Sequence, residues 1–123
     1  MPLSLAVALL GLTVLLGGAL ATSALRHPDA KPPRILATLH GFCAALGYGL
    51  LLVALQGPAR GTATGTQSFG IAAAILLLLA AMIGATNLAI HYRRRRLPGF
   101  WVGAHAMIAI TGYVILAVYL FAG

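Results

Sequence analysis

The sequence predicts an all-α integral membrane protein, an up-down four-helix bundle built from two repeated helical hairpins. Three observations predict this fold: a composition that is 61% hydrophobic and only 7% charged, four long apolar segments, and short polar links between them. A water-soluble domain of 123 residues needs far more charged surface, because a small domain leaves much of its chain exposed. We therefore expect one transmembrane domain over residues 1–123.

Each apolar segment is long enough to cross a hydrocarbon core, which takes about 20 helical residues. The predicted spans are 3–25, 35–55, 69–92 and 100–121. We expect the first span to be retained, because its apolar stretch is too long for a signal peptide and no Lys or Arg precedes it. The links are rich in proline and glycine and are short, which favours antiparallel neighbouring helices.

The basic residues gather in two of the three links. The first link holds Arg26, Lys31 and Arg34, the third holds Arg93 to Arg96, and the second holds only Arg60. A net charge of +7 can indicate a nucleic-acid partner, but these residues lie between apolar spans, so we expect no nucleic acid and contact with membrane lipid instead. The positive-inside rule predicts that links one and three face the cytoplasm and that both termini lie outside.

The spans contain an internal repeat. At an offset of 65, the second and fourth spans share the pattern His-x3-Ala-x2-Gly-Tyr, at 40–48 and 105–113. At an offset of 64, the first and third spans match Ala21, Thr22 and His27 with Ala85, Thr86 and His91. The chain therefore reads as two copies of a hairpin related by an axis along the membrane normal, with its four histidines in two pairs.

His40 and His105 form the deeper pair. Both lie about five residues into spans that run in the same direction, so the two imidazoles are expected at the same depth on diagonal helices. The diagonal of a four-helix bundle is wide enough for one metal ion held by two histidines. An ionisable side chain within a span is costly and usually functional, so we expect a metal site at this pair.

Small residues lie one and two turns from each of these histidines. They are Ala44 and Gly47 on one helix and Ala109 and Gly112 on the other. This stripe leaves room for a flat macrocycle such as haem, whereas a bare zinc or copper ion needs further ligands that no thiolate or carboxylate supplies. The alternative is that these residues only allow close helix packing.

His27 and His91 form the shallower pair, at the cytoplasmic edge. They are either histidines that interact favourably with a helix C-terminus, ligands of a second haem, or, with Arg34 and Arg93, partners of haem propionates. The same polar rim could admit a quinone headgroup.

Four polar residues, Thr22, Ser23, Thr86 and Asn87, lie near the depth of the deeper pair. They either accept the second N–H of the ligating imidazoles or bond back to their own helices.

With these residues in view, the sequence resembles the small four-helix membrane b-type cytochromes, the haem-bearing subunits of bacterial respiratory oxidoreductases. The resemblance covers the whole chain in architecture, and its specific content is the two His-x3-Ala-x2-Gly-Tyr segments. It implies one b-type haem on His40 and His105, electron transfer between a redox partner and quinone, and a place in the bacterial inner membrane among other subunits of a complex. It also implies an electron-carrying subunit more than an enzyme acting alone.

The main alternative is a cofactor-free membrane anchor or assembly subunit, whose glycines, including those in 99–103, pack against other membrane helices. Chlorophyll binding by the same histidines is a minor option. A proton-coupled exporter needs a membrane-embedded carboxylate, but the single acid, Asp29, lies in a link. A thiol-disulfide enzyme needs paired cysteines, and the chain has only Cys43. No nucleophile with a positioned base indicates hydrolysis.

Overall fold

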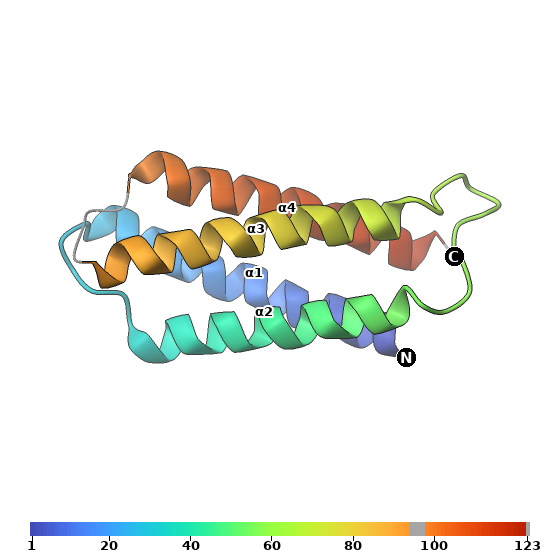
Figure 1. Cartoon of the computed structure of the whole chain (residues 1–123), viewed down its shortest axis with the longest axis horizontal. Helices are drawn as coiled ribbons and strands as arrows, with labels where there is room; N and C mark the ends of the chain where they lie inside the picture. Colours follow the sequence, from blue (N-terminus) through green and yellow to red (C-terminus); the bar gives the residue numbers. More distant parts are fainter. Residues whose placement is uncertain (94–97, 123) are drawn as a thin grey trace.

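The computed structural model describes residues 1–93 and 98–122, and within these ranges it contains four helices and no strand. The helices are α1 (Pro2–Arg26), α2 (Arg34–Ala54), α3 (Phe69–Tyr92) and α4 (Gly99–Phe121) (Figure 1). The predicted all-α bundle is confirmed, and each helix begins and ends within two residues of the expected span. Of the basic run 93–96, only Arg93 lies in the part that the structure describes.

Prolines mark the start of three helices. Pro2 occupies the first turn of α1, and α2 and α4 begin directly after Pro33 and Pro98. Proline has no N–H to donate and a fixed φ, so it fits the beginning of a helix and interrupts its interior.

All four helices are long and apolar enough to cross a membrane, which indicates an integral membrane protein. Their outer surfaces carry exposed leucine, isoleucine, phenylalanine and methionine side chains, as Phe42 and Met82 illustrate. A surface of this kind is compatible with direct contact with lipid.

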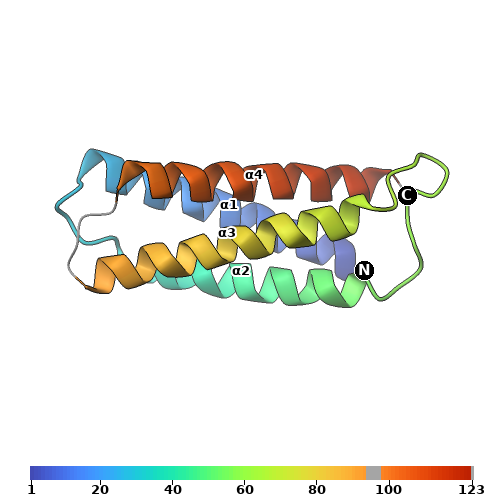
Figure 2. The same cartoon turned by 45° about the horizontal axis from the view of Figure 1, so that its top comes forward.

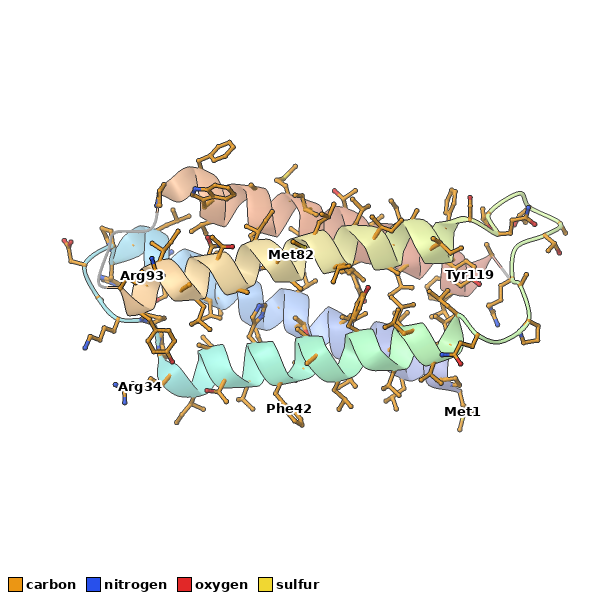
Figure 3. All side chains as sticks on the ribbon, viewed as in Figure 1. Met1, Arg34, Phe42, Met82, Arg93 and Tyr119 are labelled. Carbon is orange, nitrogen blue, oxygen red and sulfur yellow. The ribbon has the colours of Figure 1, made fainter. Side chains whose placement is uncertain are left out.

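The helices run up and down, so the chain has two distinct ends. Figures 1 and 2 show both termini and the 55–68 link at one end, and the 27–33 link with the end of α3 at the other. Arg34 and Arg93 mark the second end, which we call the basic end, and Tyr119 lies at the opposite, terminal end (Figure 3).

Each hairpin packs tightly within itself, α1 on α2 and α3 on α4. The hairpins meet chiefly between α1 and α4, whereas α2 and α3 are the most loosely packed neighbours. In the described chain, α2 and α4 face each other across the diagonal of this ring, and so do α1 and α3. This is the arrangement that short links predict.

The buried positions of α1 and α3 reveal the true register of the repeat. The buried residues of α1 are Leu3, Ala6, Val7, Leu10 and Thr13, and those of α3 are Gly70, Ala73, Ala74, Leu77 and Ala80. Every position in the first set corresponds to one in the second at an offset of 67, and Gly47 and Leu51 of α2 correspond to buried Gly112 and Leu116 of α4 at the expected 65. The predicted offset of 64 for the first and third spans is therefore wrong by three residues. It followed shared Ala, Thr and His near the helix ends, while packing is set by the face turned to the core.

The tight core occupies only the terminal half of the bundle. Leu51 and Leu116, at 0% exposure, are its largest fully buried side chains, in a cluster with other leucines, alanines and Tyr119. Among described residues of 14–42 and 81–111, none is buried. The half of the bundle toward the basic end, which contains both deeper histidines, is thus the less tightly packed half.

The link between α2 and α3 folds back on the end of α4. Arg60 Nη2 donates a hydrogen bond to the Leu120 carbonyl oxygen at 3.0 Å. A cation at this position interacts favourably with the partial negative charge of a helix C-terminus and satisfies one of its last carbonyls.

The tyrosine of each repeat reaches the neighbouring hairpin. Tyr48 Oη donates to the Ala74 carbonyl oxygen at 3.2 Å across the loosely packed α2–α3 boundary, while the Tyr113 ring lies against Gly11 of α1.

We expect Tyr48→Phe to lower the free energy of unfolding by about 0.5–1 kcal/mol, because one hydrogen bond is lost while the Ala74 carbonyl keeps its helical partner. Reversible unfolding in mixed micelles measures this loss. Tyr113→Phe is the matched control, since its hydroxyl makes no hydrogen bond to a described residue, and an equal loss in both variants would contradict the assignment.

Candidate functional site

His40 of α2 and His105 of α4 meet across the diagonal of the bundle. Their ring centroids are 6.2 Å apart and the ring planes make an angle of 72°. Because α2 and α4 are diagonal and do not pack against each other, the two side chains alone extend across the space between these helices. The structure thus brings together the pair that the repeat predicts.

Each imidazole is anchored to the adjacent helix of its own hairpin. His40 Nδ1 lies 3.0 Å from the Thr13 carbonyl oxygen of α1, and His105 Nδ1 lies 2.8 Å from the Ala80 carbonyl oxygen of α3. A carbonyl oxygen only accepts hydrogen bonds, so Nδ1 carries the proton in both rings. This fixes the tautomer and leaves Nε2 of each histidine with its lone pair, which is the form that binds a metal.

Two glycines allow the imidazoles to approach these carbonyls. A Cβ at Gly17 would lie 2.9 Å from Cε1 of His40, and a Cβ at Gly84 would lie 2.9 Å from Cε1 of His105. Each glycine is four residues after the carbonyl that its histidine contacts, so it is the residue toward which that carbonyl points in the helix. Gly17 and Gly84 are related by the same offset of 67 as the core, and they form a cradle for each ring that any side chain would fill.

The spacing of the rings suits one metal ion between them. With metal–nitrogen bonds of about 2 Å and about 1.1 Å from each nitrogen to its ring centre, two imidazoles on opposite sides of an ion have centroids about 6 Å apart. The described residues contain no group of three or more His, Cys, Asp or Glu side chains that could hold a metal ion. The donor set of this part of the chain is therefore two imidazoles, which matches the axial pair of a haem and falls short of the four ligands of a structural zinc site.

The small residues that follow each histidine divide into two groups. Ala44 and Ala109 are half-buried one turn from the histidines. Gly47 instead packs against Leu10, and Gly112 against Leu77, at distances that leave no room for a Cβ without displacement. The two glycines thus serve the close helix packing that was the alternative explanation of this stripe, and the structure does not bring them into contact with the histidine rings.

The polar residues predicted as hydrogen-bond partners of the imidazoles do not have that role here. Thr22 and Thr86 donate to the carbonyls of their own helices, four residues earlier, at 2.8 and 2.9 Å. Backbone carbonyls take their place, because they are the acceptors that lie within reach once a glycine opens the helix surface. Asn87 differs from the threonines: its Oδ1 atom is buried and has no hydrogen-bond partner among the described residues.

The shallower histidines do not form a matched pair. His27 follows the last residue of α1 and is exposed, whereas His91 lies in the last turn of α3 and is half-buried. The offset of 67 places Ala24, not His27, opposite His91, and the described residues show no ring contact between the two histidines. Arg34 and Arg93 are exposed at the same basic end (Figure 3).

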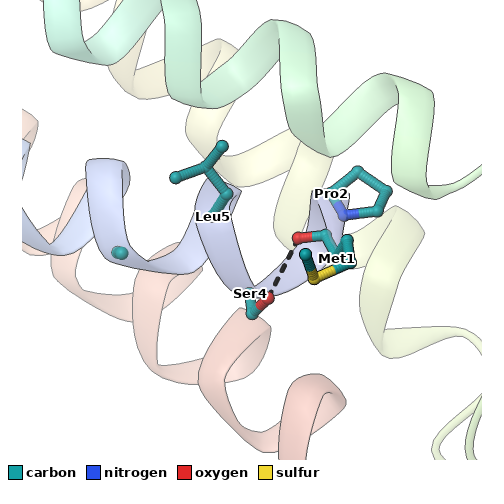
Figure 4. Close-up of a pocket in the computed structure, with 5 residues that line it drawn as sticks. Met1, Pro2, Ser4 and Leu5 are labelled. Carbon is teal, nitrogen blue, oxygen red and sulfur yellow. Dashed lines mark hydrogen bonds between the residues drawn. The ribbon is translucent and has the colours of Figure 1, made fainter.

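A surface depression lies at the terminal end of the bundle, away from His40 and His105. Figure 4 shows it at the start of α1, where it is lined by Met1, Pro2, Ser4, Leu5 and Ala8. Ser4 Oγ donates to the Met1 carbonyl oxygen at 2.9 Å, so its one hydroxyl is already bonded within the helix. The lining is otherwise apolar and faces outward at the terminal end, which suits lipid contact.

Comparison with known proteins adds no identification: no protein-family model, curated protein or solved structure matches the chain. The functional argument therefore depends on the site itself.

Proposed function

We propose that this chain binds one b-type haem through Nε2 of His40 and of His105 and serves as a membrane electron-transfer subunit. The observation that carries the proposal is the pair of imidazoles from diagonal helices with ring centroids 6.2 Å apart, each held by a hydrogen bond from Nδ1 to a backbone carbonyl, which leaves its Nε2 available to a metal. Ligating histidines in proteins nearly always donate their other N–H in this way. Glycines 17 and 84, whose missing side chains make room for the rings, support the same assignment.

The chain's own residues would hold the macrocycle in the less tightly packed half of the bundle. Leu51 and Leu116 close the core on the terminal side and exclude water there. Arg34, Arg93 and His91 are candidates to receive the propionates at the basic end, and His27 can take part there without being a ligand. A bound haem supplies reversible one-electron chemistry at its iron. The protein contributes orientation of the two ligands and a low-dielectric environment.

We further propose that this subunit works with others in a membrane oxidoreductase, between a redox partner and quinone. The net charge of +7, placed almost wholly in links one and three, supports an orientation with the basic end in the cytoplasm, as in a bacterial inner membrane. A haem held by His40 and His105 would be nearer that face, so electrons would enter and leave on the same side unless another subunit extends the path.

The absorption spectrum of the purified protein tests the proposal. We expect a Soret band, α and β bands that sharpen on reduction with dithionite, and about one haem per chain by pyridine haemochrome. Low-spin signals in electron paramagnetic resonance of the oxidised protein would report two nitrogen axial ligands. A protein that stays colourless after expression with ample haem would contradict the proposal and favour a cofactor-free anchor.

Gly84→Ala tests the cradle. The new Cβ would meet Cε1 of His105 at 2.9 Å and Nδ1 at 3.4 Å, so the ring must move away from the Ala80 carbonyl. Losing a hydrogen bond that orients a ligating histidine reduces metal affinity by about 10–100-fold, and we expect a haem loss in that range. Helix stability should not fall, because alanine is the better helix former by about 1 kcal/mol.

The control for this experiment lies next to the symmetry-related glycine. Gly17→Ala should reproduce the effect of Gly84→Ala, since its Cβ would meet His40 at the same distance. Gly18→Ala should leave haem content unchanged, because nothing lies within 4 Å of its Cβ position. Equal haem loss in Gly17→Ala and Gly18→Ala variants would show that the cradle is not the cause.

A further inference from the structure

The face of α3 that holds His105 continues as a polar stripe toward the basic end. Gly84, Asn87 and His91 are spaced three and four residues apart, so they lie on one face of the helix. The corresponding residues of α1, at the offset of 67, are Gly17, Leu20 and Ala24. The repeat therefore keeps the glycine that admits the imidazole and differs at the next two positions, where α3 alone is polar.

Asn87 has an unmet hydrogen-bonding requirement within the described chain. Its Oδ1 atom is buried and has no partner there, although the residue lies in a membrane-spanning helix where an unpaired amide oxygen is costly. The neighbouring Thr86 satisfies its hydroxyl on the Met82 carbonyl. An asparagine amide offers both an acceptor and two donors, and a half-turn of the amide exchanges them, so the position can present an N–H to an anion.

The geometry of the histidine pair directs the edge of a macrocycle toward this residue. The two histidines come from the diagonal helices α2 and α4, so a porphyrin held between them would have its edges toward the helices of the other diagonal, α1 and α3. Asn87 is three residues from Gly84, or about 4.5 Å along the helix toward the basic end. The propionates of a haem bound here would point toward the basic end, because the opposite direction leads into the buried core that contains Leu51 and Leu116.

We propose that Asn87 binds a propionate of the haem through its side-chain amide. This contact would fix the orientation of the macrocycle, with a propionate next to α3 and pointing toward the basic end. The inference rests on the proposed haem site and assigns it a residue on one side of the pseudo-twofold axis only. His91, one turn further along the same stripe, extends the polar path to the exposed Arg93.

Two porphyrins that differ only in the carboxylates and ring substituents can test this role. Haem-free protein in detergent micelles is titrated with haem b and with iron etioporphyrin, which has no propionates. Asn87→Leu introduces the residue that α1 carries at the equivalent position, and we expect it to weaken haem b binding about tenfold while leaving iron etioporphyrin binding unchanged. Thr86→Val is the matched control and should change neither, because Thr86 is exposed and bonded to its own helix.

Three results would overturn or redirect the inference. Unchanged haem b affinity in Asn87→Leu would overturn it, and so would an equal loss for both porphyrins, which would indicate a general packing role. Asn87→Ala repeats the test with a smaller side chain, in case leucine obstructs the site. If the wild-type protein binds neither porphyrin, the proposed function itself fails, and that outcome is distinct from the other two.

Discussion

Alanine at His40 or at His105 is expected to abolish the low-spin haem spectrum. In the proposed site each imidazole would supply one nitrogen ligand to the iron, and no other His, Cys, Asp or Glu in the described chain joins them in a metal-binding group. Loss of a directly bound ligand should exceed the 10–100-fold effect of losing a residue that only orients one, so we expect haem affinity to fall by more than about 100-fold. Haem content per chain, measured after purification and again after adding haem, gives the result.

The shallower histidines provide the comparison for this experiment. His27→Ala and His91→Ala should keep the low-spin spectrum, because neither side chain contacts the deeper pair through a hydrogen bond or ring contact that the described structure shows. His91→Ala can reduce affinity modestly if it removes a partner of a propionate. A spectrum retained in the His40 and His105 variants and lost in the His27 and His91 variants would mean that the iron is held by the other pair.

Leu51→Ala and Leu116→Ala are expected to destabilise the bundle by about 2–5 kcal/mol each. Both side chains have 0% exposure and lie at the centre of the closed core, at positions related by the offset of 65. Truncation leaves a cavity within this buried cluster. Lost packing contacts should account for most of the destabilisation, because lipid gives little hydrophobic driving force between helices. Unfolding in mixed micelles, followed by circular dichroism, measures the change.

Leu52 is the natural control, since it adjoins Leu51 in α2 and is 44% exposed on the outer surface. Leu52→Ala should change the free energy of unfolding by much less than either core substitution. A large loss of unfolding free energy in Leu52→Ala with a small one in Leu51→Ala would show that the opposite face of α2 is turned toward the core.

The fold could be predicted almost completely from the sequence. Four apolar segments of the right length, separated by proline and glycine, leave few alternatives to an antiparallel bundle, and the helices differ from the expected spans by at most two residues at either end. The pairing of His40 with His105 was predictable for the same reason, because an offset of 65 puts them at one depth on diagonal helices.

The surroundings of the histidines were less predictable. Nothing in residue type distinguishes Gly17 and Gly84 from the other glycines of the chain, and only the offset of 67 singles them out as a pair. Their carbonyl partners at Thr13 and Ala80 share no side-chain feature, since the hydrogen bonds involve the backbone. Reasoning from the sequence considers side chains, and it therefore predicted Thr22 and the other polar residues as hydrogen-bond partners of the imidazoles.

The offset that relates α1 to α3 in the repeat was predicted as 64 and not 67, because a few shared residues near the helix ends outweighed the pattern of buried positions. The second hairpin is two residues shorter between its glycine and its histidine than the first, from Gly17 to His40 and from Gly84 to His105. One constant offset therefore cannot align both helices of the hairpins. Aligning the periodic buried positions of each helix separately would have given the correct value.

The anchoring of each imidazole to its own hairpin has a consequence for how such a site can be assembled. His40, Gly17 and the Thr13 carbonyl belong to the first hairpin, and His105, Gly84 and the Ala80 carbonyl belong to the second. Each hairpin thus carries one half of the proposed site, with its imidazole already oriented, and the two halves need only be brought face to face. Two identical copies of one such hairpin, joined about a true twofold axis, would meet the same geometric requirement without the link that connects them in this chain.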